Sequence, residues 1–284
     1  MSNEIINVYQ PNQRARTGFF QLYALMFKNI IASKELIAQL FKRDFLMAYK
    51  KSFLGMTWIF LSPLIGIISW VFMNATGILS PGDVGIPYPA FVLLSSSVWG
   101  LFMGFYSSAA QTINAGGGFI TQVKYPHEAL LVKQTAEHLA NFTLGFAMNI
   151  VILLIFGVIP SWKIIFFPLL ALPLFLLGAG IGLVISVITV VAIDLTKAFD
   201  FVFGLLFYIT PVIYSSTIDN QLLQTMTRYN PLTYLIGNTR DLIIYGTFDN
   251  PLFYFYSVIF AIVIFAISWR LFYLSEEKVI EKLI

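Results

Sequence analysis

The chain has 284 residues, of which 58 % are hydrophobic and 11 % charged, and its net charge is only +3. This composition excludes an ordinary soluble domain and indicates an integral membrane protein. Because the sequence contains no cysteine, it also excludes disulfides, thiolate metal sites and cysteine nucleophiles. Aromatic residues make up 17 % of the chain, which is more than two interfacial belts require, so some of them are expected to face protein or a passage.

A basic segment, residues 1–52, precedes the first apolar run and ends in an amphipathic stretch over 34–50. At about 100° per residue, the apolar side chains of this stretch fall on one face and Lys42 and other polar residues on the opposite face. The pattern predicts a helix that lies along the membrane surface. Asp44 falls within the apolar face, where an ionised carboxylate is costly without a cation. It either anchors the helix to the transmembrane core or reaches solvent at the helix edge.

Six apolar runs come next along the chain, and a helical crossing of the hydrocarbon core takes about 20 residues. The fifth run is the shortest and ends at Thr210-Pro211, so it is expected to cross incompletely or with help from the segment after it. Together the runs define a transmembrane region over 53–274, with a tail over 275–284. The six predicted spans are 53–78, 86–113, 138–159, 164–193, 199–214 and 251–274.

The distribution of basic residues predicts the orientation of the chain. Of 17 lysines and arginines, 14 lie in the two terminal segments, at the end of the last span (Arg270) or in the second and fourth connections. The positive-inside rule therefore places both termini in the cytoplasm. The three basic residues assigned to the other side are Lys163, Arg228 and Arg240.

The connection before the last span is long and contains two short amphipathic patterns, over residues 217–246, with a break at Asn230-Pro231. They predict a re-entrant helical hairpin, which is tolerated at membrane depth where protein or a wet cavity covers the backbone. The alternative is a pair of helices lying flat on the outer surface.

Signatures of catalysis and nucleotide binding are missing from the sequence. No Gly-Lys dipeptide occurs, so the phosphate-binding P-loop is absent. The stretch "HEALL" at 127–131 has Leu131 where a zinc protease needs its second histidine. Charges within the spans are also nearly missing, which leaves no buried ion relay of the type that secondary transporters use and weakens the hypothesis of ion-coupled transport. We predict no catalytic residue and no metal site, and we expect the energy for any work to come from another subunit.

Small residues recur every four positions in two of the predicted spans, which permits close approach of helices within or between chains. These residues are Ser96, Gly100, Gly104 and Ser108 in the second span, and Gly178, Gly182 and Ser186 in the fourth.

Four separated stretches together resemble the permease subunit of type-2 ABC exporters for polysaccharides, the family that exports O-antigens, capsules and teichoic acids. Their order and spacing agree with that family across most of the chain. The stretches are "KRDFLMAYKKSFLGMTWIFLSP" at 42–63, "INAGGGFITQVKYPHEAL" at 113–130, "TPVIY" at 210–214 and "YNPLTYLIGNTRDLIIYG" at 229–246.

The resemblance implies an all-α protein with six transmembrane helices, working as a homodimer in the inner (cytoplasmic) membrane. Two copies of a separate ATPase would bind ATP and Mg²⁺, so this chain needs no cofactor of its own and no nucleic acid. The helix at 34–50 and a coupling segment at 115–135 would face the ATPase. The implied contact residues are Arg43, Asp44, Lys124, Tyr125, Pro126, His127 and Glu128.

A lipid-linked polysaccharide would pass between the two permeases, along the first and fifth spans. Sugars have apolar faces, so aromatic rings suit a polymer that must slide. Arg240, and with it Arg228, either meets a lipid-linked phosphate or pairs with Asp219 or Asp241. The candidates for the substrate path are Trp58, Phe60, Trp70, Phe199, Phe203, Phe207, Tyr208 and Arg240.

Two other functions fit part of the pattern. A type-2 ABC permease for a small drug or lipid would share the ATPase partner but need fewer aromatic residues in its passage. An ion-coupled secondary transporter or a channel would work without an ATPase.

Overall fold

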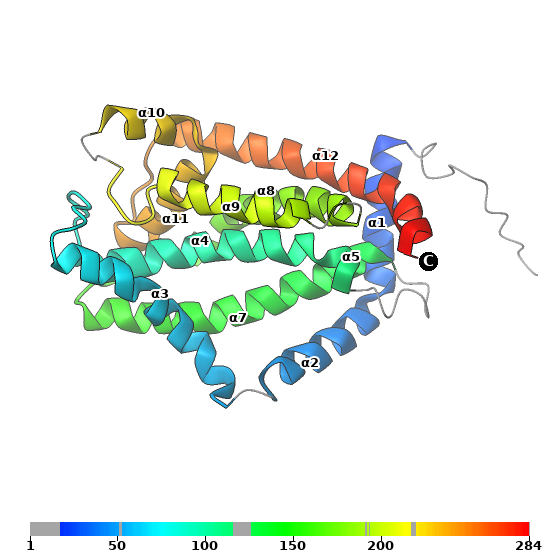
Figure 1. Cartoon of the computed structure of the whole chain (residues 1–284), viewed down its shortest axis with the longest axis horizontal. Helices are drawn as coiled ribbons and strands as arrows, with labels where there is room; N and C mark the ends of the chain where they lie inside the picture. Colours follow the sequence, from blue (N-terminus) through cyan, green and yellow to red (C-terminus); the bar gives the residue numbers. More distant parts are fainter. Residues whose placement is uncertain are drawn as a thin grey trace, which may run out of the picture.

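The computed structural model describes residues 18–50, 53–115, 126–190, 192, 194–216 and 220–283. In these residues every regular element is helical, and the long helices run side by side along the molecule (Figure 1). The N-terminal helix α1 and the end of α12 lie at one end of this bundle, and α10 lies at the other (Figure 1). The helices are α1 (Phe19–Ala32), α2 (Lys34–Lys50), η2 (Gly55–Thr57), α3 (Trp58–Ala75), α4 (Tyr88–Ala110), α5 (Thr112–Ala115), α7 (His127–Ile155), η3 (Trp162–Phe166), α8 (Phe167–Thr189), α9 (Asp194–Ile209), α10 (Gln221–Tyr229), α11 (Pro231–Ile244) and α12 (Pro251–Leu283).

Helices α4 and α8 form the centre of the bundle, and glycines let them approach closely. A Cβ atom at Gly178 of α8 would lie 2.8 Å from the carbonyl oxygen of Phe102, and one at Gly182 would collide with the α4 backbone. On another side of α8, a Cβ at Gly180 would lie 3.0 Å from Cα of Phe265 in α12. The predicted seam of small residues in the fourth span is therefore a contact within the chain.

Five helical segments of the described residues are long and apolar enough to cross a membrane. The predicted fifth span corresponds to α9, which has 16 residues and both begins and ends earlier than expected. It stops before Pro211, which disfavours helical geometry at Thr210. The five candidates are Gly55–Ala75, Tyr88–Ala110, His127–Ile155, Trp162–Thr189 and Pro251–Ser275.

The segment before the first span contains two helices, only one of which was predicted. Helix α2 covers Lys34–Lys50, as its amphipathic pattern indicated. The additional helix α1 packs on α7 and buries Leu22 and Met26 in a cluster with Phe272 of α12. This helix closes the bundle at the end where α12 terminates (Figure 1).

The predicted coupling segment at 115–135 is partly a helix. Its second half, from His127, forms the first turns of α7, with extended Pro126 at the N-cap and Glu128 in the first turn. A carboxylate is favourable there because it faces the positive end of the helix dipole. Residues 116–125, which include Lys124 and Tyr125, lie outside the described part of the chain.

The break at Asn230-Pro231 separates α10 from α11, as predicted. The Asn230 side chain caps α11 by accepting a hydrogen bond from the Leu232 amide at 3.0 Å, and it donates another to Thr210 Oγ1 at 2.8 Å. Helix α11 is buried against α4, α8 and α12, whereas α10 is largely exposed. The hinge is therefore tied directly to the turn that ends α9.

Candidate functional site

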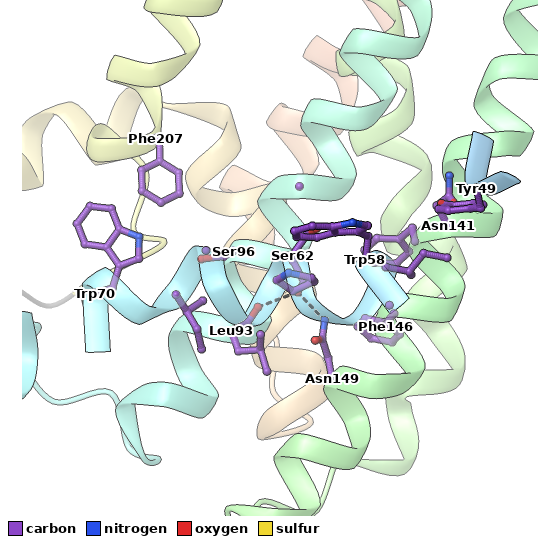
Figure 2. Close-up of a pocket in the computed structure, with 18 residues that line it drawn as sticks. Tyr49, Trp58, Ser62, Trp70, Leu93, Ser96, Asn141, Phe146, Asn149 and Phe207 are labelled. Carbon is purple, nitrogen blue, oxygen red and sulfur yellow. Dashed lines mark hydrogen bonds between the residues drawn. The ribbon is translucent and has the colours of Figure 1, made fainter. Parts of the chain in front are cut away.

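A cavity of about 540 Å³ lies between α3, α4 and α7 (Figure 2). It exists because α3 stands away from the centre of the bundle. Only 6 % of the residues in the apolar stretch of this span are buried, against 67 % for α4. Tyr49, near the end of α2, lies on one side of the view, and Trp70 and Phe207 lie on the other (Figure 2). The cavity thus extends along α3 from the α2 end toward α9.

Aromatic rings form the end of the cavity nearest α9. The ring of Trp70 lies 5.8 Å from that of Phe207 and 6.0 Å from that of Tyr208, measured between centroids. Phe207 also makes an edge contact with Trp99 of α4 at 5.4 Å. Such clusters offer flat apolar surface without a fixed pattern of hydrogen bonds.

A few polar groups interrupt the apolar wall. Asn149 of α7 donates a hydrogen bond to Ser97 of α4 at 2.5 Å, and the Tyr49 hydroxyl donates one to Asn141 at 2.6 Å. Ser96 also lines the cavity, and its buried hydroxyl finds no hydrogen-bond partner among the described residues. A ligand with hydroxyl groups can satisfy such a position, whereas a hydrocarbon cannot.

Two glycines keep the cavity open. Gly66 of α3 and Gly100 of α4 both line it, and a Cβ atom built on either would meet no described atom within 4 Å. Glycine inside a helix costs about 1 kcal/mol relative to alanine. Since neither position needs glycine for helix packing, the space itself is the feature that glycine preserves here.

The predicted path residues divide into three groups. Trp58, Trp70 and Phe207 line the cavity. Phe203 is only 4 % exposed and packs on Phe102 and Tyr106 of α4. The remaining aromatic candidates lie outside the cavity lining: Phe60 and Phe199 are half-buried, and Tyr208 is exposed.

Arg240 lies away from this cavity, inside the α11 end of the molecule. Its guanidinium donates to both oxygens of Asp241, at 2.8 and 3.3 Å, and to the carbonyl oxygen of Pro211 at 3.0 Å. It also lies 4.5 Å from the centroid of the Phe91 ring. Of the two roles considered for Arg240, the structure shows the pairing with Asp241. Asp219 lies outside the described residues.

Asp44 connects α2 to the bundle. Its carboxylate lies 2.7 Å from Nζ of Lys133 in α7 and 2.6 Å from Nε of Arg43. Lys133 also pairs with Glu137 at 3.0 Å. Burial acts to raise the pKa of Asp44, but the hydrogen bonds and the positive charges of Arg43 and Lys133 together outweigh it and lower that pKa below its ordinary value. The aspartate is thus an anchor to the transmembrane core, one of the two roles its position allowed. We call these four residues the α2–α7 clasp.

The other described residues assigned to ATPase contact differ in exposure. His127 and Glu128 are each only 1 % exposed, and Glu128 accepts a hydrogen bond from Asn29 of α1 at 2.7 Å. Their side chains therefore hold the start of α7 against α1 and α12 and present almost no surface. Pro126, just before them, is half-buried.

One signal in the sequence marks this site and was missed. Lys133, Glu137, Asn141, Gly145 and Asn149 recur every four positions along α7. The first two belong to the clasp, and the last three line the cavity. Polar and small residues at this spacing form one continuous stripe on a helix. Asn141, Gly145 and Asn149 could have been found by following it, whereas Tyr49 lies on α2, outside this stripe.

Residues 35–244 match the family described as "ABC-2 type transporter". A relative from Myxococcus xanthus, named "O-antigen export system permease protein RfbA", is 27 % identical over 203 residues, covering 71 % of this chain and 77 % of the relative. A relative of the same name from Klebsiella pneumoniae is 24 % identical over 251 residues, covering 86 % and 94 %. No group of three or more histidine, cysteine or acidic residues suited to a metal ion occurs in the described residues.

Proposed function

The chain belongs to the ABC-2 type transporter family, and from this premise we propose that it is the transmembrane subunit of an ATP-driven exporter of a lipid-linked polysaccharide, of the O-antigen, capsule or teichoic acid class. A separate nucleotide-binding subunit would bind and hydrolyse ATP. The cavity beside α3 is the observation that supports this class of substrate. It combines aromatic walls, isolated hydroxyl and amide groups, and open space preserved by two glycines. The names of the relatives support the same class of cargo.

In the proposed topology, the chain crosses the inner membrane six times, with both termini in the cytoplasm. Helix α9 supplies the short fifth crossing, and α10 and α11 form a hairpin that re-enters from the side opposite to the cytoplasm. The burial of α11 against α4, α8 and α12 supports this arrangement, since a re-entrant segment needs protein around it.

We further propose a homodimer whose passage lies between α3 and α9 of the two copies. Both helices carry large apolar side chains that the other described residues leave uncovered. A second copy, together with lipid, would cover them. These side chains are Ile65, Ile68 and Phe72 on α3, and Phe201, Leu205 and Tyr208 on α9.

In the proposed mechanism, the ATPase pushes on α2 and on the segment that ends at Pro126. Asp44 would pass the movement of α2 to Lys133 of α7, and the Tyr49–Asn141 hydrogen bond would pass it to the cavity wall. Because α7 carries both the clasp and three residues of the cavity, a shift of α7 would change the width of the cavity.

Deletion of the gene in its native host tests the function directly. We expect the surface polysaccharide to disappear, and its lipid-linked form to accumulate inside the cell, as seen on immunoblots of surface and cytoplasmic fractions. A permease for a drug or lipid would instead leave the surface polymer intact and change drug or lipid efflux, and that result would overturn the proposed substrate.

Filling the cavity tests its role in export. Gly100→Leu and Gly66→Leu add bulk where no described atom lies within 4 Å, so the fold should tolerate them while polymer export falls at least tenfold. The matched control is Ala147→Leu, which adds bulk to the exposed face of α7 and should export normally. Normal export by both glycine variants would exclude the cavity from the path.

A further inference from the structure

A second, polar cavity of about 320 Å³ lies between α10, α11 and the residues that follow α9 and precede α12. Helix α10 lies at the end of the bundle away from α1 (Figure 1). The size of this cavity is at the lower end of the range for small-molecule sites. It is separate from the cavity beside α3, because the two share no lining residue.

The charges of this cavity balance. Arg228, Arg240, Asp241 and Asp249 all line it, which gives two positive and two negative groups. Arg240 is already paired with Asp241 through two hydrogen bonds. An anion would therefore meet two carboxylates and a cation two guanidinium groups, so a neutral polar ligand fits best.

Hydrogen-bonding capacity remains inside the cavity. The Thr233 hydroxyl is buried and lacks a hydrogen-bond partner in the described part of the chain. The carboxylate of Asp249 accepts one bond from the Asn250 side chain at 2.9 Å, and a carboxylate offers about four acceptor positions. A buried hydroxyl without a partner costs about 1–3 kcal/mol, which a ligand hydroxyl would recover.

The cavity also has a flat wall and reserved space. The Tyr234 ring is held by stacking on Phe253, with centroids 5.2 Å apart and planes at 12°. Gly237 is buried in the middle of α11, yet a Cβ atom there would meet no described atom within 4 Å. As with Gly66 and Gly100, the glycine weakens its helix by about 1 kcal/mol and leaves room rather than a close contact.

We propose that this cavity binds one neutral sugar unit. A pyranose has the matching chemistry: an apolar face for Tyr234, and several hydroxyls for Thr233, Asp249 and the outer oxygens of Asp241. The assignment of this sugar to the exported polymer rests on the proposed function. With that assignment, the cavity is a subsite that holds one sugar unit of the polysaccharide at the end of the protein away from α1.

Photo-crosslinking tests the site. The purified chain in lipid nanodiscs is irradiated with diazirine-bearing glucose and N-acetylglucosamine, and the adducts are mapped by mass spectrometry. We expect adducts on the α10–α11 segment that unlabelled sugar displaces. Gly237→Leu fills the cavity and should reduce these adducts at least tenfold. Ala147→Leu is the control, because it adds bulk to the exposed face of α7 outside this cavity, and it should leave them unchanged.

Thr233→Val separates a ligand role from a structural one. Because the hydroxyl makes no hydrogen bond to the described residues, its removal should leave the melting temperature unchanged or higher, while adducts fall several-fold. Absence of adducts on α10–α11 in the native chain, or adducts that both Gly237→Leu and Thr233→Val leave intact, would overturn the site. If the protein exports polymer normally but gives no such adducts, this inference is wrong and the proposed function stands. If it gives the adducts but exports no polymer, the proposed function is wrong and the sugar site stands.

Discussion

The two ends of the bundle are each joined by an arginine and an aspartate that are neighbours in sequence, yet the two pairs differ in character. At the α2 end, the side chains of Arg43 and Asp44 are 59 % and 31 % exposed, and one contact to Lys133 reaches α7. At the α11 end, Arg240 is 4 % exposed and joins three separate parts of the chain. Water screens the first pair and not the second.

The difference indicates which end holds and which end moves. Arg240 ties α11 to the turn at Pro211 and to Ser95 of α4, so these parts form one rigid unit. Helix α2 is held to α7 by a small apolar cluster around Leu40 and by polar contacts that are partly exposed on the α2 side. Partly exposed polar contacts break and re-form at smaller cost than buried ones. A helix that is moved from outside needs contacts that can open. Helix α2, which we propose the ATPase moves, has such contacts to α7.

The largest expected effect comes from breaking the buried joint. Arg240→Met leaves the Asp241 carboxylate without its cation and should lower the free energy of unfolding by about 3–5 kcal/mol. Thermal unfolding in detergent measures it. Arg228→Met, at an exposed arginine on α10, is the control and should change little. Equal effects from the two substitutions would contradict the rigid unit.

The next effect comes from the α2–α7 clasp. Lys133→Met removes the cation shared by Asp44 and Glu137 and should lower the free energy of unfolding by about 1–2 kcal/mol. Polymer export should fall more strongly than stability, because α2 loses its contact to α7 while the ATPase still turns over. Lys42→Met removes an exposed lysine of α2 and should leave both quantities unchanged. Export that stays normal in Lys133→Met would exclude the clasp from coupling.

A smaller effect is expected where α2 meets the cavity. Tyr49→Phe removes only the hydroxyl that donates to Asn141, and should cost about 0.5–1.5 kcal/mol of unfolding free energy. In the proposed mechanism, this substitution also raises the number of ATP molecules hydrolysed for each polymer exported. The comparison of Asn141→Leu with Tyr49→Phe checks the pairing, since the double variant should cost no more than the larger single change.

The smallest effect is that of pH on the clasp. The pKa of Asp44 is lowered in the fold, so its contribution is complete above the ordinary carboxyl pKa of about 3.9 and is lost as the pH falls through the lowered value. The α2–α7 distance should therefore be constant between about pH 8 and pH 5. Because the chain has no cysteine, spin labels at Lys42→Cys and Leu139→Cys can report this distance. A change within that interval would contradict an ionised Asp44.

Several parts of the molecule could be predicted from local pattern. The bounds of α2 followed from its amphipathic period, and the break between α10 and α11 followed from Asn230-Pro231. The start of α7 was missed, because polar residues such as Lys133 and Glu137 resemble a connection until the partner of Lys133 on α2 is known. Helix α1 was missed for a similar reason, since Leu22 and Met26 acquire a role only when α12 covers them.

The order of residues was sufficient to establish the class of the protein, because apolar runs of spanning length, the distribution of basic residues and the absence of a nucleotide-binding loop are properties of the chain read from end to end. Helix packing was needed to show which aromatic residues share a cavity, which glycines face open space, and that Asp44 meets Lys133 whereas Arg240 is enclosed. The reason is physical. Helical period and hydropathy act between near neighbours along the chain, but a cavity or an ion pair depends on which helices come together in space, and that is settled by the packing of the whole bundle.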